Sequence, residues 1–189
     1  MSATEVLEFW FGEPGSAEHL RSRSLWFTKS DATDRAIAER FGAIVEDALA
    51  GSHDDWAATP RGALALVILL DQFTRNIHRN TPRAFAGDAR ALALATRLVD
   101  TARDLSLAPV ERWFAYMPFE HSERLVDQYE SVRLFERLAA DGLEAPLDWA
   151  RKHFDVVARF GRFPHRNAIL GRVSTPEEVE YLKQPGAGF

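Results

Sequence analysis

The sequence contains no cysteine among its 189 residues. Without thiols the chain forms no disulfides, and thiolate nucleophiles, Fe–S clusters and cysteine-based zinc sites are excluded with them. The absence of cysteine is compatible with a cytosolic protein.

Long hydrophobic runs are also missing. The longest apolar run, residues 63–70, is too short to span a bilayer. Residues 1–9 have neither the basic start nor the apolar core of a signal peptide. We therefore predict a soluble cytoplasmic protein with no membrane partner.

An excess of positive charge is a third feature that the chain lacks. Its formal net charge is −5 and its pI is about 5.7. General nucleic-acid binding needs a dominant basic face, so no nucleic-acid partner is expected. Glycine-rich phosphate loops, dinucleotide-binding fingerprints and the Gly-x-Ser-x-Gly nucleophile motif are absent as well, and no cofactor is predicted.

The residues that are present are typical of a folded domain. Hydrophobic residues make up 46% of the chain, and five Trp with 13 Phe supply large side chains for a core. Helix signals recur along the sequence, whereas no run shows the strict apolar alternation of a strand. The predicted fold class is all-α, with residues 1–183 as a single domain and residues 184–189 as a loose C-terminal tail.

About eight helices are expected, packed as an irregular stack of antiparallel hairpins. The predicted N-terminal caps are Ser2 with Glu5 for a short first helix, Ser30 or Asp31 for a long second one, and Thr59 before Pro60 for the helix that follows. Later helices are expected at residues 84–103, 109–118, 122–140 and 146–160, and after Thr175. The helix that contains residues 63–70 is apolar all round and is therefore predicted to be the central buried one.

The run that follows this apolar stretch is polar. If the helix continues, Asp71, Arg75 and Arg79 lie along one face at four-residue steps, with Gln72 and Asn76 beside them. Ionised groups on a buried helix indicate a ligand or a catalytic step. The structural alternative is that Asp71 simply pairs with Arg75, while the arginines complement the C-terminal helix dipole.

A second polar motif, residues 117–123, is predicted at the N-terminus of a helix. In it His121 lies between Glu120 and Glu123. A histidine in such surroundings has a charge state open to tuning near neutral pH, which suits general acid or base chemistry. A metal bound with His153 or His165 is the alternative, but no standard metal-binding spacing occurs and no metal is predicted.

A third motif, residues 159–167, concentrates arginine in an acidic protein. Residues 151–172 carry a net charge of +5. The polar residues that follow Gly161, a glycine suited to a left-handed turn, are Arg162, His165, Arg166 and Asn167. Guanidinium groups at this density suit binding of carboxylate or phosphate, and they equally suit a structural network.

Several strings of the chain resemble a family of bacterial proteins, domain-of-unknown-function family number 924 (DUF family 924). They are residues 6–12 (VLEFWFG), 68–79 (ILLDQFTRNIHR), 117–123 (MPFEHSE), 159–167 (RFGRFPHRN) and 170–172 (LGR). The resemblance covers nearly the whole chain and implies a tetratricopeptide-like helical stack, without a known reaction. Thr74 stands where the family string has proline, which implies a more regular exit of the central helix.

Three functional hypotheses follow. In the first, the motifs converge on a pocket for a small anionic molecule (carboxylate or phosphate), and the protein is a hydrolase with catalytic residues His121, Glu123 and His165. Its predicted ligand-binding residues are Asp71, Gln72, Arg75, Asn76, Arg79, Arg162, Arg166 and Asn167. In the second, the helical stack is a non-catalytic scaffold that binds a peptide or protein. In the third, Asp71, Arg75, Glu123 and Arg166 form one buried ion network that holds the fold together. The oligomeric state stays open.

Overall fold

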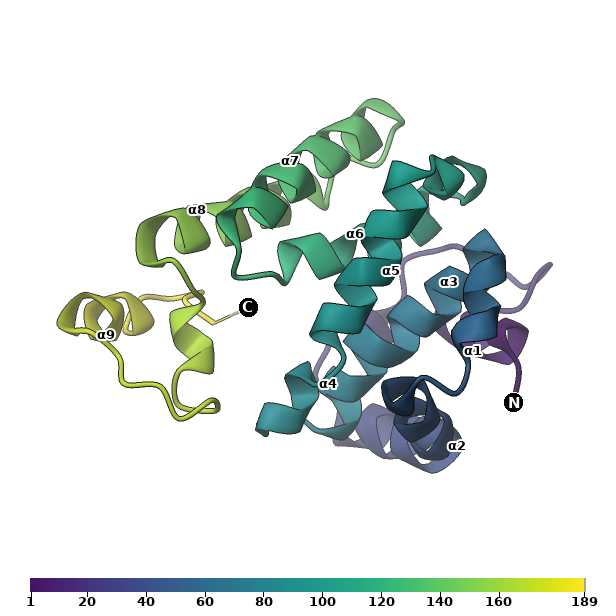
Figure 1. The fold of residues 1–189 in the computed structure, drawn as a ribbon, viewed down its shortest axis with the longest axis horizontal. Helices are drawn as coiled ribbons and strands as arrows, with labels where there is room; N and C mark the ends of the chain where they lie inside the picture. Colours follow the sequence, from purple (N-terminus) through teal and green to yellow (C-terminus); the bar gives the residue numbers. More distant parts are fainter. Residues whose placement is uncertain (189) are drawn as a thin grey trace.

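The computed structural model describes residues 1–188, and all their regular structure is helical (Figure 1). The α-helices other than the central one are α1 (Ala3–Phe11), α2 (Asp31–Ala50), α5 (Asp88–Asp100), α6 (Pro109–Glu120), α7 (Leu125–Ala140), α8 (Leu147–Phe160) and α9 (Pro176–Leu182). Short 3₁₀ segments are η1 (Ser24–Trp26), η2 (Asp54–Ala58), η4 (Pro82–Phe85), η5 (Arg103–Ser106) and η6 (Pro164–Arg166). The predicted all-α fold class is confirmed.

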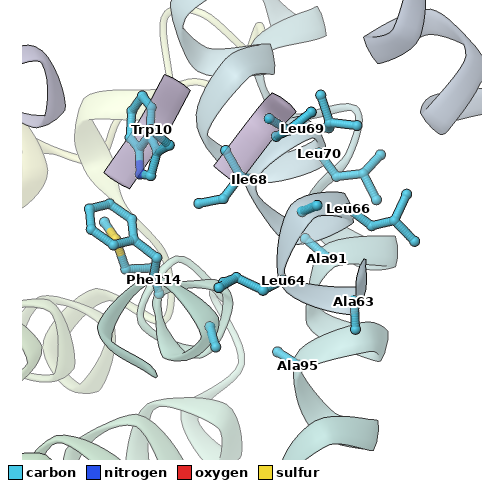
Figure 2. Close-up of a cluster of buried hydrophobic side chains, with 14 of the residues drawn as sticks. Trp10, Ala63, Leu64, Leu66, Ile68, Leu69, Leu70, Ala91, Ala95 and Phe114 are labelled. Carbon is cyan, nitrogen blue, oxygen red and sulfur yellow. The ribbon is translucent and has the colours of Figure 1, made fainter. Parts of the chain in front are cut away.

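The central helix consists of three segments in direct succession: α3 (Pro60–Val67), the π-helical segment η3 (Ile68–Phe73) and α4 (Thr74–Ile77). Taken as one helix, it brings the α-helices of residues 1–188 to eight. Residues 62–74 are all buried, as the apolar run predicts. Figure 2 shows Trp10 of α1 and Phe114 of α6 on one side of this helix, and Ala91 and Ala95 of α5 on another.

Local capping chemistry sets several helix ends where it was predicted. The Ser30 hydroxyl accepts a hydrogen bond from the Thr33 amide at 3.2 Å and begins α2. The Thr59 hydroxyl likewise accepts from the Gly62 amide at 3.0 Å and begins α3. Gly161 ends α8 in the left-handed conformation, with φ 68°. These starts and stops follow from short-range sequence alone.

The end of the central helix differs from the prediction. The helix stops at Ile77, because His78 leaves helical geometry at φ −111° and ψ 28°. Arg79 therefore lies beyond the helix. The prediction that Arg79 shares one helix face with Asp71 and Arg75 is wrong.

The boundary between α6 and α7 also differs. α6 does not end at Pro118 but continues through it to Glu120, and α7 begins at Leu125 and not at Ser122. The amide of Gln128 donates to the carbonyl groups of residues 119, 120 and 122 at 3.3, 2.7 and 2.6 Å, which stabilises this helix end. His121 is consequently the C-cap of α6, so the predicted position of the 117–123 motif at a helix N-terminus is wrong.

The single helix predicted for residues 84–103 is divided. Residues 82–85 form η4, and α5 begins only at Asp88 after Gly87. Gly87 packs against the central helix so closely that an added Cβ atom would lie 2.1 Å from the carbonyl oxygen of Leu70. This backbone contact sets the N-terminus of α5 directly on the π-helical segment.

The C-terminal part has a small core of its own. It consists of Val156, Val157 and Phe163, covered by Phe160 and Tyr181. Helices α7 and α8 lie side by side, in contact along their length (Figure 1). The tetratricopeptide-like character of this packing and the single-domain assignment stay predictions.

The last described residues lie against this part. Ala187 is buried, and Gly188 lies close to the Cβ atom of His165. The predicted tail, residues 184–189, ends at Phe189, which lies outside the described residues. Among residues 1–188, no helix has the length and apolar character needed to cross a membrane.

Replacing Gly87 by alanine tests the contact with Leu70. Because the methyl group meets a backbone oxygen that cannot move alone, Gly87→Ala is expected to lower the free energy of unfolding by about 1–3 kcal/mol. Gly42 of α2 is the matched control, since an added Cβ meets nothing within 4 Å there. Gly42→Ala is expected to raise stability by about 0.5–1 kcal/mol. Denaturant unfolding measures both, and equal effects of the two variants would contradict the contact.

Candidate functional site

A cavity of about 580 Å³ lies between η1, the end of the central helix, α6 and α8. Its apolar wall consists of Leu25, Trp26, Phe27, Trp113, Met117 and Trp149. Its polar wall consists of Asn76, Arg79, Glu120, His121 and His153, and Thr28, Lys29 and Ala145 complete the lining. Seven of the fourteen lining residues are apolar and seven are polar or charged, and the volume is in the range of small-molecule sites.

His121 is oriented by a buried carboxylate. Its Nδ1 atom lies 2.7 Å from Oδ1 of Asp71, which comes from the π-helical segment and is fully buried. The same Oδ1 lies 2.9 Å from Nη1 of Arg75, and the amide of Gln72 donates to Oδ2. Since an ionised carboxylate only accepts hydrogen bonds, Nδ1 carries the proton and Nε2 of His121 is left as the basic nitrogen.

The charge states of this pair follow from their surroundings. Burial raises the pKa of Asp71, but Arg75 and then His121 outweigh burial and hold that pKa well below its ordinary value. Burial lowers the pKa of His121, and although Asp71 opposes this, Arg75 adds to the lowering. At neutral pH the pair is therefore an ionised aspartate beside a neutral imidazole.

Glu120 is the second unusual group of the polar wall. Burial, followed by the negative charge of Asp71, raises the pKa of Glu120 to about 8, so the carboxyl group is mostly protonated at neutral pH. Its Oε1 atom lies 3.0 Å from Nδ1 of His153, which is also 2.8 Å from the carbonyl oxygen of Trp149. Its Oε2 atom is buried and has no hydrogen-bond partner within residues 1–188. Burial lowers the pKa of His153 to about 3, so this contact joins two neutral groups.

Arg75 links the site to the third motif. It binds Asp88 of α5 with both terminal nitrogens, at 2.8 and 3.0 Å. Arg166 lies 3.8 Å from the same carboxylate, with its guanidinium 4.9 Å from the Phe85 ring centroid and 4.4 Å from that of Phe163. Burial and the charge of Arg75 lower the pKa of Arg166 to about 10. The structure thus brings all three motifs together through the acidic groups at positions 71 and 88.

Asn76 and Arg79 form a separate contact on the cavity wall. The Asn76 amide donates to Asp34 of α2 at 2.7 Å, and Arg79 binds the same carboxylate with two nitrogens at 2.7 and 2.8 Å. Both residues line the cavity, but the structure joins them to α2 and not to Asp71. Their role as ligand-binding residues stays a prediction.

The remaining predicted residues contact the C-terminal elements. Arg162 binds Glu178 of α9 at 2.6 and 2.8 Å, and the Asn167 amide donates to Glu178 at 3.2 Å. Glu123 binds Arg172 at 2.6 and 2.9 Å. Burial raises the pKa of Glu123, but the hydrogen bond from Arg172 outweighs burial, so the net pKa is below the ordinary value. These contacts match the structural network given as the alternative for the third motif.

His165 lies in the same C-terminal region. Its ring centroid is 5.6 Å from that of Phe163. Burial, followed by the charge of Arg166, lowers the pKa of His165 to about 4, so its imidazole is neutral at neutral pH. Neither Glu123 nor His165 is among the residues that line the cavity, and their predicted catalytic roles stay untested.

Sequence reasoning did not assign the apolar wall, Asp88 or the carboxyl group of Glu120 to the site. Glu120 and His153 entered only as alternative metal ligands, yet no group of three or more His, Asp and Glu side chains placed to hold a metal occurs within the described chain, 1–188. The sequence feature that could have assigned Glu120 to the site is its position next to His121 at the end of a buried helix. The apolar wall had no signal, because its residues come from three distant elements.

Comparisons with known proteins agree with this architecture. A family model described as bacterial protein of unknown function (DUF924) matches residues 6–186. A solved structure of the protein of unknown function ATU0120 from Agrobacterium tumefaciens is similar, with 36% sequence identity, 97% of each chain covered and a TM-score of 0.84. No curated protein matches the sequence.

The protonated state of Glu120 predicts a pH dependence of stability. A raised folded pKa contributes stability that is complete below about pH 4.5 and is lost as the pH rises through about 8. Between pH 7 and 8 the free energy of unfolding should therefore fall by about 1 kcal/mol, because the group ionises over this range. Glu120→Gln cannot titrate and should flatten this slope in urea unfolding series, whereas Glu136→Gln, which removes an exposed glutamate, should keep it. A wild-type slope in Glu120→Gln would contradict the protonated state.

Proposed function

The chain belongs to the DUF924 family of bacterial proteins, and we propose that it is a hydrolase that cleaves an ester bond of a small anionic molecule bound in the cavity. One observation carries the proposal: the imidazole of His121, oriented by Asp71, and the buried carboxyl group of Glu120 lie in the same cavity wall. The pKa of His121 is lowered and the pKa of Glu120 is raised. A proton acceptor and a proton donor are thus both available at neutral pH.

Water is the nucleophile in this proposal. Nε2 of His121 takes a proton from the water molecule as its oxygen bonds to the ester carbonyl carbon. Glu120 gives its proton to the alcohol oxygen as the carbon–oxygen bond breaks, so the products are a carboxylic acid and an alcohol. The proton held by His121 then returns to Glu120 through solvent. Asp71 orients the imidazole and stabilises its positive charge in the transition state.

Cationic groups in the lining support an anionic substrate. Lys29 forms no ion pair within the described residues, and Arg79 lies in the polar wall. Arg79 is partly neutralised by Asp34, so Lys29 is the stronger candidate for the anionic group of the substrate. Arg75 and Arg166, predicted to bind the ligand, do not line the cavity. Arg75 contacts Asp71, and Arg166 contacts Asp88.

A peptide-binding scaffold is the second candidate function. A groove of about 440 Å³ lies between α5 and α7, and its lining includes Val126 and Tyr129, each 60% exposed. Exposed apolar side chains along a groove favour binding of an extended or helical peptide. The groove is separate from the cavity, so variants of these two residues distinguish the two functions.

Replacement of the general base tests the hydrolase proposal. With the anionic ester 4-nitrophenyl hydrogen glutarate as substrate, we expect His121→Gln to lower kcat/KM by about 100-fold or more. His53→Gln is the matched control, because His53 lies at η2, outside the cavity lining. Melting temperatures show whether each variant stays folded. Absence of wild-type turnover on anionic esters, or full activity in a folded His121→Gln protein, would refute the proposal.

A further inference from the structure

Two large aromatic side chains of the apolar wall are exposed to solvent. Phe27 is 57% exposed and Trp149 is 50% exposed, and both line the cavity. Large apolar side chains gathered at a hollow mark a surface that is covered on binding. In this case they come from different elements, since Phe27 follows η1 and Trp149 lies in α8.

Two rings of the wall, Phe27 and Trp113, are held in place by neighbouring rings. Phe27 stacks on Trp113, with ring centroids 5.2 Å apart and planes at 26°. Trp113 meets Trp26 edge to face at 6.1 Å, and the indole N–H of Trp26 donates to the carbonyl oxygen of Trp10 at 2.9 Å. This part of the wall is therefore fixed before any ligand arrives, which lowers the entropic cost of binding.

The polar side of the same cavity offers a hydrogen-bond donor and a positive charge, so a matching ligand carries a hydrogen-bond acceptor and a negative charge. Oε2 of Glu120 is buried without a partner in the described part of the chain, and a protonated carboxyl group has one proton to donate. The ammonium group of Lys29 supplies a positive charge in the same lining. A fitting ligand combines a flat apolar body with a carbonyl or carboxylate oxygen.

We propose that the ligand of this cavity is an aromatic carboxylate or an aromatic ester that keeps one anionic group, whose ring system packs on Phe27, Trp113 and Trp149 and whose oxygen accepts a hydrogen bond from Glu120. The ester form rests on the proposed hydrolase function, whereas recognition of the ring does not. Aromatic rings gain stacking contacts on an aromatic wall that a saturated body of the same volume lacks. The wall therefore selects aryl over alkyl ligands.

Calorimetric titration of the full chain with two probes tests this selection. We expect 2-naphthoate to bind about tenfold more tightly than decahydro-2-naphthoate, which has similar volume but no aromatic ring. Phe27→Leu and Trp149→Leu should each weaken 2-naphthoate binding several-fold. Because both side chains are half exposed, these variants should keep the wild-type melting temperature. Tyr181→Leu removes an aromatic ring packed on Phe160 of the C-terminal core and should leave binding unchanged.

The outcomes separate ring recognition from hydrolysis. Equal affinity for the two probes, or no binding of 2-naphthoate at millimolar concentration, overturns the aromatic assignment. Tight and selective 2-naphthoate binding without ester turnover supports the assignment and refutes the hydrolase. Turnover of alkyl and aryl esters at the same kcat/KM supports the hydrolase and overturns the selection for rings.

Discussion

The buried carboxylate of Asp71 is the group on which both the fold and the site depend. A charge at this depth is stable only when it is paired, and here Arg75 and His121 both contact it. Arg75 also binds Asp88 at the start of α5, while His121 ends α6. One carboxylate therefore fixes three helices relative to one another and at the same time orients the imidazole that faces the cavity.

The ion pairs of the C-terminal part lie away from the cavity lining. Glu178 with Arg162, and Glu123 with Arg172, connect α9 and η6 to the body of the fold. The cavity instead collects groups whose neutral forms are favoured, such as Glu120 and His153. Asp71 and Arg75 belong to both the ion-network and the site hypotheses, and Asp88, which Arg75 and Arg166 share, joins them to the C-terminal part.

Short-range signals were enough for much of the fold and for part of the site. The caps at Ser30 and Thr59 and the apolar run of the central helix depend only on nearby residues. The end of α6 after Pro118 is bonded by the amide of Gln128, and Gly87 before α5 lies against the Leu70 carbonyl; both contacts join residues that are far apart or in different elements. For the site, the polar motifs identified Asp71 and His121 as candidates from the sequence. The apolar wall could not be predicted in this way, because it forms only where η1, α6 and α8 meet.

The π-helical segment, residues 68–73, places one more residue in the central helix than an α-helix spanning the same distance along its axis would contain. Each residue of an α-helix turns the chain by about 100°, so a deletion within residues 68–73 would rotate everything that follows by that angle. Arg75 would then leave Asp88. The length of this segment is therefore what keeps Arg75 in register with the N-terminus of α5.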